Sequence, residues 1–331
     1  MASYMNEDVL KKLDCEEISC CICGSNSNRS VSRGYDYEYQ TTQQEFTFVQ
    51  CNNCGHLFLN PRPKITCADL IYPPNYYTLA GRHSADRSKI ISFFKNKIIL
   101  NRLSYFKPFF DKPMSLLEIG CGDCSLLLSL KAKFPHLICH GVDIRFSELH
   151  RRACRDIGIE LIQGPIETVD LPDNTYDLII MNQLLEHLWY PEDVIAKIYR
   201  VLSKGGMVSI ETVDSSGYDR ILFSRSFWGG YYFPRHMNLF SDEGLRKLLE
   251  QNGFKISCSY SLLAPIVWTF SFHAALSHNP NWLNSILGKF FTDSNPLCLA
   301  MFAVIDLIAL SIGLTTSNQK IIAKKEGEVA D

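Results

Sequence analysis

Five short apolar segments, interleaved with turns and helical patterns, constrain the fold of this sequence more than any other feature. These segments, which read as strands, are residues 115–119, 137–143, 160–163, 178–181 and 207–212. Helical spacing of apolar side chains follows the first strand at residues 125–134 and the fourth at residues 194–202. Strands that alternate with helices over roughly a hundred residues predict a doubly wound, Rossmann-like, mostly parallel sheet.

The turn after the first strand, Gly120-Cys121-Gly122, lies where an open sheet binds its ligand. A dinucleotide loop has a third glycine for close packing of the helix, but here that position is Ser125. S-adenosylmethionine has no phosphate to hold; its pocket needs backbone clearance at the two glycines and an acidic residue just before the turn, here Glu118. The turn therefore favours a methyl donor over a dinucleotide.

A carboxylate follows the second strand at Asp143, 21 residues after Gly122. At this spacing a carboxylate can accept hydrogen bonds from both ribose hydroxyls of an adenosine. The spacing alone fits an NAD enzyme as well as a methyltransferase.

Two CxxCG units, Cys20–Cys23 and Cys51–Cys54, predict a metal site near the amino terminus. Four thiolates close a tetrahedral zinc site with no open position, so this zinc would be structural. Cys21 is expected to be a spare, and the segments YDYEYQ and EFTFVQ between the units are expected to be the strands of a zinc ribbon. Thirteen cysteines in a chain with no apolar run in residues 1–14 suggest a reducing, cytoplasmic environment.

The motifs LLEIGCGDCSLL, GVDI, LPDNTYDLIIMNQLLEHL and YRVLSKGGMVSIET resemble those of class I S-adenosylmethionine-dependent methyltransferases, from residue 115 to about 260. The whole chain resembles a bacterial subgroup in which a CxxCG zinc segment and a YPPxYY-type crossing precede the methyltransferase domain, as in some deoxysugar C-methyltransferases. The resemblance implies S-adenosylmethionine and structural zinc as cofactors. The resemblance, together with position in the chain, suggests eleven cofactor-binding residues. These are Glu118, Gly120, Cys121, Gly122, Asp143, Ile144, Ile166, Asn182, Gln183, Tyr76 and Tyr77. Two positions depart from the family pattern: Cys124 replaces a third glycine, and Pro165 replaces an acidic residue near the adenine.

Candidate catalytic residues lie in the loops after the fourth and fifth strands. Glu186 and His187 stand where some quinone-precursor O-methyltransferases bind a metal ion, but Gln183 replaces a further carboxylate, which argues against a catalytic metal. His236 is the candidate base or substrate anchor, with Tyr232 and Arg235 beside it. For both histidines, a purely structural hydrogen bond is the alternative.

The carboxyl-terminal region departs most from a minimal methyltransferase. Residues 254–260 are expected to be the sixth strand and residues 318–324 an antiparallel seventh, but residues 262–314 intervene with two strongly apolar runs. The second run contains Asp306, and a single membrane span would separate the last strand from its sheet. We expect two or three buried helices that form a lid or a homodimer surface, with a membrane-surface contact as the alternative. A basic amphipathic helix is expected at residues 89–106.

The predicted organisation has four parts. These are a zinc-ribbon module (1–75), a crossing and helix (76–113), the S-adenosylmethionine-binding domain (114–261 with 315–325) and the helical insertion (262–314). The expected activity is methyl transfer to a small molecule or a saccharide, such as a sugar nucleotide, a lipid-linked glycan or a secondary metabolite. A net charge of −2 argues against a nucleic-acid partner. Two alternatives remain: an RNA methyltransferase whose ribbon grips RNA, and a non-catalytic scaffold. The expected location is cytoplasmic, with peripheral membrane association as a variant.

Overall fold

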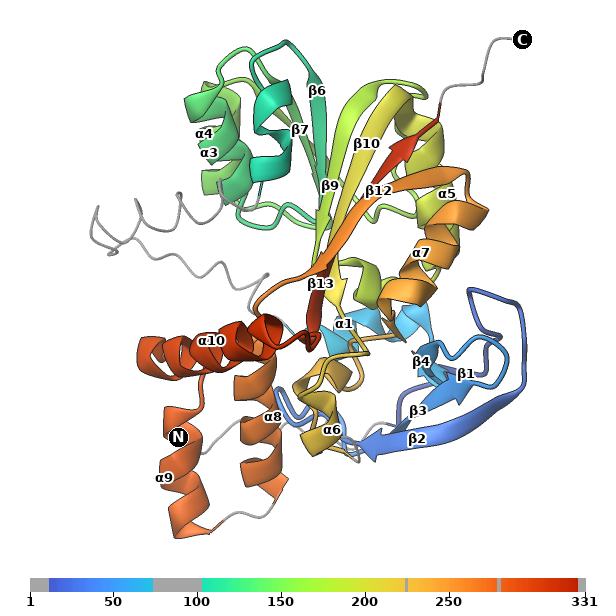
Figure 1. Ribbon diagram of the computed structural model, residues 1–331, viewed down its shortest axis with the longest axis vertical. Coiled ribbons are helices and arrows are strands. Elements are labelled where there is room, and N and C mark those ends of the chain that lie inside the picture. The colour runs from blue at the N-terminus through green and yellow to red at the C-terminus, as the bar shows by residue number, and fades with distance from the viewer. Residues whose placement is uncertain (1–11, 74–102, 224–225, 279–280, 327–331) are drawn as a thin grey trace.

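The computed structural model describes residues 12–73, 103–223, 226–278 and 281–326 of the chain. A large sheet with helices on both faces lies above a smaller amino-terminal sheet, and three helices project beside the smaller sheet (Figure 1). A strand late in the sequence, β11 (Asn238–Leu239), belongs to the amino-terminal sheet, where it pairs with β4 (Leu57–Leu59).

The large sheet has seven strands in the order β12-β13-β10-β9-β6-β7-β8. Their bounds are β6 Ser115–Ile119, β7 Ile138–Asp143, β8 Ile159–Gln163, β9 Tyr176–Asn182, β10 Leu202–Val213, β12 Phe254–Ser261 and β13 Asn318–Lys325. Only β13 runs antiparallel to its neighbours, β10 and β12. The predicted Rossmann-like fold with an antiparallel last strand is confirmed. The largest boundary difference is at β10: Leu202, expected to belong to the preceding helix, is its first residue and pairs with Tyr176 of β9.

Two hydrophobic clusters lie on opposite faces of this sheet because successive strand residues point to opposite sides. Leu117 and Ile179 pack with α5 (Pro191–Val201) and α7 (Asp242–Gln251). Leu116 and Leu178 pack on the other face with α3 (Ser125–Lys133) and α4 (Glu148–Asp156). Ser241 caps the start of α7, since its hydroxyl accepts a hydrogen bond from the Gly244 amide at 3.1 Å.

The amino-terminal module contains a small paired sheet, β1 (Cys15–Glu16) with β5 (Arg62–Pro63), and a four-stranded antiparallel sheet. The larger sheet consists of β2 (Asn28–Gly34), β3 (Phe46–Cys51), β4 (Leu57–Leu59) and β11 (Asn238–Leu239). EFTFVQ is a strand as predicted, but the prediction for YDYEYQ is wrong: residues 35–40 form a turn. The reason is Asp36, whose buried carboxylate accepts hydrogen bonds from the Tyr39 and Thr41 amides and bends the chain.

Two short helices, η2 (Ile65–Cys67) and α1 (Ala68–Ile71), carry the chain from the amino-terminal module to the large sheet. The helix predicted for residues 89–106 lies mostly outside the described residues. Its described end leads into a short helix, η3 (Ser104–Phe109), which packs Phe106 into the core.

The insertion before β13 consists of three helices, as predicted: α8 (Pro265–His278), α9 (Trp282–Phe290) and α10 (Pro296–Ser311). Asp306 of α10 faces inward and accepts hydrogen bonds from the Trp268 indole (2.9 Å) and the Ala264 amide (2.7 Å). The expectation that these helices are buried holds only for that inner side. Apolar side chains of α10 are exposed on its other side, namely Leu297, Met301, Val304, Ile305, Leu307 and Ile308. Within the described residues, every helix is too short or too polar to cross a bilayer.

Candidate functional site

A pocket opens at the carboxyl ends of β6, β7, β8 and β9, where an open α/β sheet places its ligand. Its floor is built from the turns that follow these strands, and η2 and α1 of the amino-terminal module form part of its wall through Ile65, Ala68 and Tyr72. Of the residues predicted to bind the cofactor, six line this pocket: Gly120, Gly122, Asp143, Ile144, Ile166 and Gln183.

The glycine turn has the backbone shape that the sequence predicted. Gly120 and Gly122 have φ values of +75° and +52°, a region that favours glycine. A Cβ atom on Gly120 would also approach Leu184 to 3.1 Å, at the pocket wall. The Gly122 amide donates a hydrogen bond to the Asp143 carboxylate at 2.8 Å, so β7 and the turn hold each other in place. Cys124 adopts φ +58° at the start of α3, which explains why the family pattern has glycine there.

The Asp143 carboxylate reaches the pocket in an environment that disfavours its charge. Burial raises the pKa of Asp143, although hydrogen bonds from the amides of Gly122 and Arg145 oppose the shift. A ligand that donates hydroxyl hydrogen bonds to this carboxylate would therefore relieve its desolvation. The adenosine ribose has such a pair of hydroxyls.

Three other predicted cofactor residues lie behind the pocket lining. Glu118 is buried at the end of β6, and burial raises its pKa well above the usual value. One of its carboxylate oxygens has no hydrogen-bond partner among the described residues, and the same holds for the Asn182 amide oxygen. Cys121 packs into the hydrophobic cluster with Leu127. Tyr76 and Tyr77 lie outside the described residues.

Several pocket residues were not predicted from the sequence. Tyr72, in the first part of YPPNYY, lines the pocket from the amino-terminal side, and Leu184 and Trp189 line it after β9. Glu167 also lines it, two positions after Pro165, and brings a carboxylate to the region where the family pattern expects one. Because helix and strand periodicity carries no information on loops, spacing alone could not have identified these four residues.

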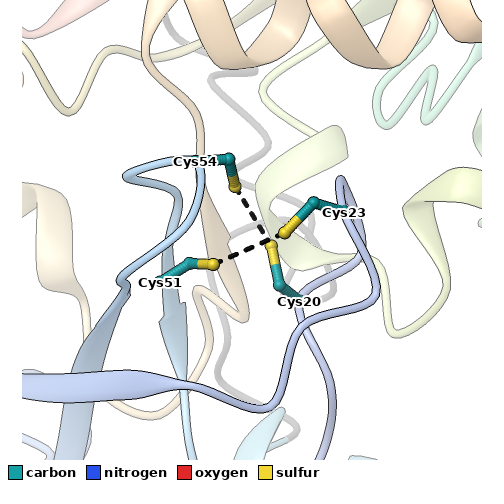
Figure 2. A group of neighbouring side chains, drawn as sticks. All are labelled: Cys20, Cys23, Cys51 and Cys54. Atoms are coloured by element: carbon teal, nitrogen blue, oxygen red, sulfur yellow. Dashed lines mark hydrogen bonds between the residues drawn. The ribbon is translucent and has the colours of Figure 1, made fainter.

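The four cysteines of the CxxCG units converge at one point of the amino-terminal module (Figure 2). The Sγ atoms of Cys20 and Cys54, and of Cys23 and Cys51, lie 3.5 Å apart. Zinc–sulfur bonds of about 2.3 Å give tetrahedral edges of about 3.8 Å, so this arrangement fits a zinc ion. Gly24 and Gly55 take φ values of +69° and +76° directly after each unit, as the turns require.

Cys21 lies outside this cluster. Its thiol contacts the His56 imidazole at 3.4 Å and the Asn238 side chain at 3.6 Å. Asn238 belongs to β11, which follows the His236 loop. Cys21 therefore links the amino-terminal module to that part of the chain and is not a member of the four-cysteine cluster.

A polar cluster at the pocket edge brings together the candidate catalytic residues from two loops. Glu186 and His187 lie in the short helix η4 (Leu185–His187), and His236 follows η5 (Gly229–Tyr231). One potential ligand atom from each of the three lies within 4.8 Å of the others, and the two imidazole rings lie 4.7 Å apart. His187 also lines the pocket, so the cluster and the pocket are continuous.

Burial controls the protonation of this cluster. It lowers the pKa of His187 to about 4 and the pKa of His236 well below its usual value. It raises the pKa of Glu186 to about 7. Both imidazoles are therefore neutral near pH 7, and each has one nitrogen lone pair available to accept a proton or bind a cation.

Tyr232 packs over the cluster, with its ring 5.1 Å from His236 and stacked on Phe270 of α8 at 5.5 Å. The helical insertion thus contacts the loop that carries His236. Tyr232 has φ +37°, an uncommon conformation for a residue with a side chain.

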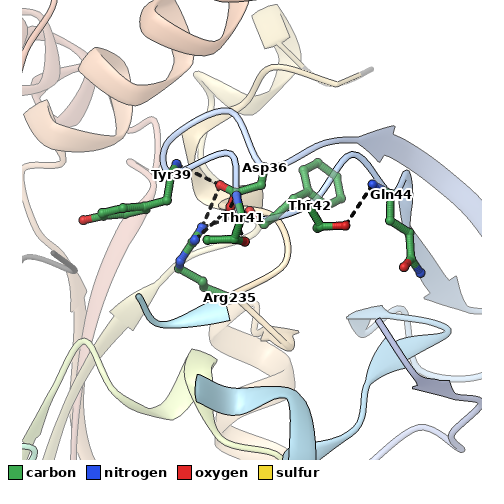
Figure 3. Close-up of polar contacts among 7 residues, drawn as sticks. Asp36, Tyr39, Thr41, Thr42, Gln44 and Arg235 are labelled. Carbon is green, nitrogen blue, oxygen red and sulfur yellow. Dashed lines mark hydrogen bonds and ion pairs between the residues drawn. The ribbon is translucent and has the colours of Figure 1, made fainter. Parts of the chain in front are cut away.

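Arg235 lies next to His236 in sequence but points into the amino-terminal module (Figure 3). Its guanidinium donates hydrogen bonds to both oxygens of Asp36 at 2.9 and 2.8 Å, and both side chains are fully buried. Hydrogen bonds and the charge of Arg235 outweigh burial and hold the pKa of Asp36 below its usual value. We therefore describe Arg235 as a residue that positions the His236 loop, since its charge is not available to a substrate.

Comparisons with known proteins agree with this geometry. The model of the methyltransferase domain family matches residues 93–259, about half of the chain. The malonyl-[acyl-carrier protein] O-methyltransferase of Priestia megaterium is 29% identical over 174 residues, which cover 48% of this chain and 62% of that protein. The uncharacterised methyltransferase YdaC of Bacillus subtilis is 36% identical over 102 residues, covering 29% of this chain and 54% of YdaC.

The chain thus spans less than two thirds of the length of these curated relatives. Among solved structures, an S-adenosylmethionine-dependent methyltransferase from Archaeoglobus fulgidus aligns with 21% identity and a TM-score of 0.44, covering 70% of this chain and 94% of that one. The family match covers the strands and turns that build the pocket, and on this evidence the chain belongs to the methyltransferase domain family.

Proposed function

We propose that this protein transfers a methyl group from S-adenosylmethionine to a small molecule or a saccharide. The observation that carries the proposal is the continuity of the pocket with the polar cluster: His187 belongs to both. A methyl donor held in the pocket would have its reactive end near two neutral imidazoles and a carboxyl group. Methyltransferase relatives, including one named for an O-methylation of an acyl-carrier-bound substrate, support this class of reaction.

The pocket residues have separate parts in holding the methyl donor. Asp143 would accept hydrogen bonds from the ribose hydroxyls, and Gly120 and Gly122 would leave room for the donor against the backbone. Ile144 and Ile166 provide apolar surface on either side of the adenine position, with Glu167 at its edge. When bound, the cofactor supplies a methyl group already activated by its sulfonium.

The polar cluster has the properties of an acid–base site for the acceptor. A hydroxyl acceptor must lose a proton as its oxygen is methylated, and a neutral imidazole at neutral pH can take it. His236 is buried, and its Nδ1 proton is donated to the Gly230 carbonyl at 2.7 Å, which leaves Nε2 as the basic atom. We assign His236 as the base, with His187 beside it and Tyr232 covering both.

We also propose that the four-cysteine site holds a structural zinc ion. Its four sulfur atoms leave no position open for a substrate. The site lies in the module that contributes Tyr72, Ile65 and Ala68 to the pocket wall, so the metal would stabilise one side of the cofactor site.

Calorimetric titration of the purified chain with S-adenosylhomocysteine, with NAD as control ligand, tests the cofactor assignment. We expect binding of the former alone. A filter-binding series with RNA at increasing salt then tests the alternative class of acceptor, since a phosphate-driven complex would weaken steeply with salt. Binding of NAD, or of neither ligand, would contradict the proposal.

A further inference from the structure

The polar cluster has an excess of hydrogen-bond acceptors. The His187 Nδ1 atom lies 3.1 Å from the Arg235 carbonyl, and the His236 Nδ1 atom lies 2.7 Å from the Gly230 carbonyl. A carbonyl oxygen only accepts hydrogen bonds, so the His236 Nδ1 atom must carry the proton. The His187 Nδ1 atom also lies 3.2 Å from the Tyr72 hydroxyl, so it can donate to the carbonyl or accept from Tyr72. The nitrogen left with a lone pair is therefore Nε2 in His236, and the neutral His187 ring keeps one lone pair in either tautomer.

Glu186 adds a third acceptor to the cluster. The carboxylate is fully buried, and one oxygen accepts a hydrogen bond from the Thr212 hydroxyl at 2.8 Å. The other oxygen has no hydrogen-bond partner among the residues that the structure describes. A buried acceptor without a partner is costly, because it has lost its hydration and gained nothing in return.

The nearby Arg235 side chain does not give these acceptors a positively charged partner. Both terminal nitrogens of the adjacent Arg235 guanidinium donate hydrogen bonds to Asp36. The Tyr72 hydroxyl lies 3.3 Å from the Arg235 carbonyl and 3.2 Å from the His187 Nδ1 atom. One imidazole nitrogen of each histidine and one Glu186 carboxylate oxygen lie within 4.8 Å of one another, and a cation would be a common partner for all three.

We propose that Glu186, His187 and His236 bind a divalent transition-metal ion of the zinc type, in addition to the ion at the four cysteines. Two imidazoles and one carboxylate are a ligand set that such ions prefer, and three protein ligands leave a coordination position open. Zinc binds these atoms at about 2.0–2.2 Å, so the ligand atoms would move together by roughly 1 Å.

The third ligand explains why the sequence argued against this site. Gln183, in the same loop as Glu186, offers no carboxylate as a further ligand. The structure instead brings His236 to the site from a loop about fifty positions later. The fold fixes this approach, since the Met237 amide donates a hydrogen bond to the Glu186 carbonyl at 2.7 Å.

His187 also lines the pocket, so an acceptor held there would lie close to such an ion. An acceptor with an oxygen ligand, such as a hydroxyl or a carboxylate, could complete the coordination. With the ion bound, His236 would be a ligand and not the base, and the ion would instead lower the pKa of a bound hydroxyl. This role depends on the proposed methyl transfer, but the binding of the ion does not. The test therefore measures the metal and not the activity.

The experiment is a metal count on the full-length chain. Elemental analysis after zinc loading and removal of unbound ion should give two equivalents per chain. Titration with Co²⁺ should show one site with a thiolate charge-transfer band, from the cysteines, and a second site without it. A single equivalent of metal, accompanied by the thiolate band alone, would overturn the proposal.

Variants assign each equivalent. Glu186→Gln and His236→Ala should each lose the second equivalent and keep the first, which also shows that the chain has folded. Their affinity at the second site should fall by about 100-fold or more, because changes to groups that only support a ligand already cost 10–100-fold. Cys51→Ser should lose only the thiolate site, and His140→Ala, a histidine on β7 outside the cluster, should keep both. Retention of both equivalents by Glu186→Gln and His236→Ala would also refute the assignment.

Discussion

Replacement of Asp36 by asparagine tests how strongly the amino-terminal module is attached to the His236 loop. Asp36→Asn keeps the shape of the side chain but leaves the Arg235 guanidinium buried without a counter-charge. Both side chains are fully buried, and the pair makes two charge-assisted hydrogen bonds of 2.8–2.9 Å. Loss of one partner of such a pair typically costs 3–5 kcal/mol, so we expect the free energy of unfolding to fall by about that amount.

Urea denaturation followed by tryptophan fluorescence measures this change, because Trp228 lies buried in the cluster that joins the two parts. The matched control is Glu45→Gln, which breaks the exposed Arg33–Glu45 pair of the same module. An exposed pair contributes about 0–1 kcal/mol, so this control should change little.

A double-mutant cycle with Arg235→Met completes the test. The double variant has neither buried charge, so it should be less destabilised than the sum of the two single variants, by about 2–3 kcal/mol. If Asp36→Asn costs less than about 1 kcal/mol, or if the two changes add, the pair does not hold the loop and the positioning role of Arg235 is refuted.

Four further predictions concern the pocket, the metal and the surface. Asp143→Ala should weaken S-adenosylhomocysteine binding by about 1–3 kcal/mol in calorimetry, because ribose hydroxyls would lose their acceptor; unchanged affinity would remove Asp143 from the cofactor site. Cys51→Ser should release zinc and lower the melting temperature, and an intact chain that contains no zinc in elemental analysis would end that assignment. Tyr72→Phe removes the hydroxyl that donates to the Arg235 carbonyl and should cost about 0.5–1.5 kcal/mol of unfolding free energy in urea; a cost near zero would show that this hydrogen bond does not join the two parts. We propose that the apolar side of α10 forms a homodimer surface, so Val304→Lys with Ile308→Lys, which places charges at two exposed positions of that side, should convert a dimer into monomers in sedimentation velocity; a wild-type chain that sediments as a monomer would contradict this proposal.

The order of β and α elements could be predicted because strand and helix periodicities are local. β6 and most of β7, β9, β10, β12 and β13 follow directly from apolar runs, and the glycine turn with Asp143 follows from spacing. The turn at residues 35–40 was missed because its aromatic residues have high strand propensity, while its conformation is set by the buried Asp36 and a partner about two hundred residues away.

The candidate site shows the same limit. His236 and Glu186 were each identified, but nothing in their spacing indicates that two loops place them within 4.8 Å. Arg235 was expected beside a substrate because of its neighbour in sequence, whereas adjacent residues of an irregular loop point in different directions. Its role depends on a long-range ion pair, which single-sequence patterns do not contain.

The pairing of β11 with β4 has a consequence for the order in which the chain becomes structured during synthesis. Leu57 and Phe58 leave the ribosome some 180 residues before their partners Asn238 and Leu239, so the four-stranded sheet is incomplete for most of translation. At a typical 5–20 residues per second, this interval lasts about 10–40 seconds. During that time the edge of β4 lacks β11, and the carboxylate of Asp36 lacks Arg235. All four cysteines precede β4 and are therefore synthesised before it, so metal binding at this site would hold the incomplete sheet together until β11 is made.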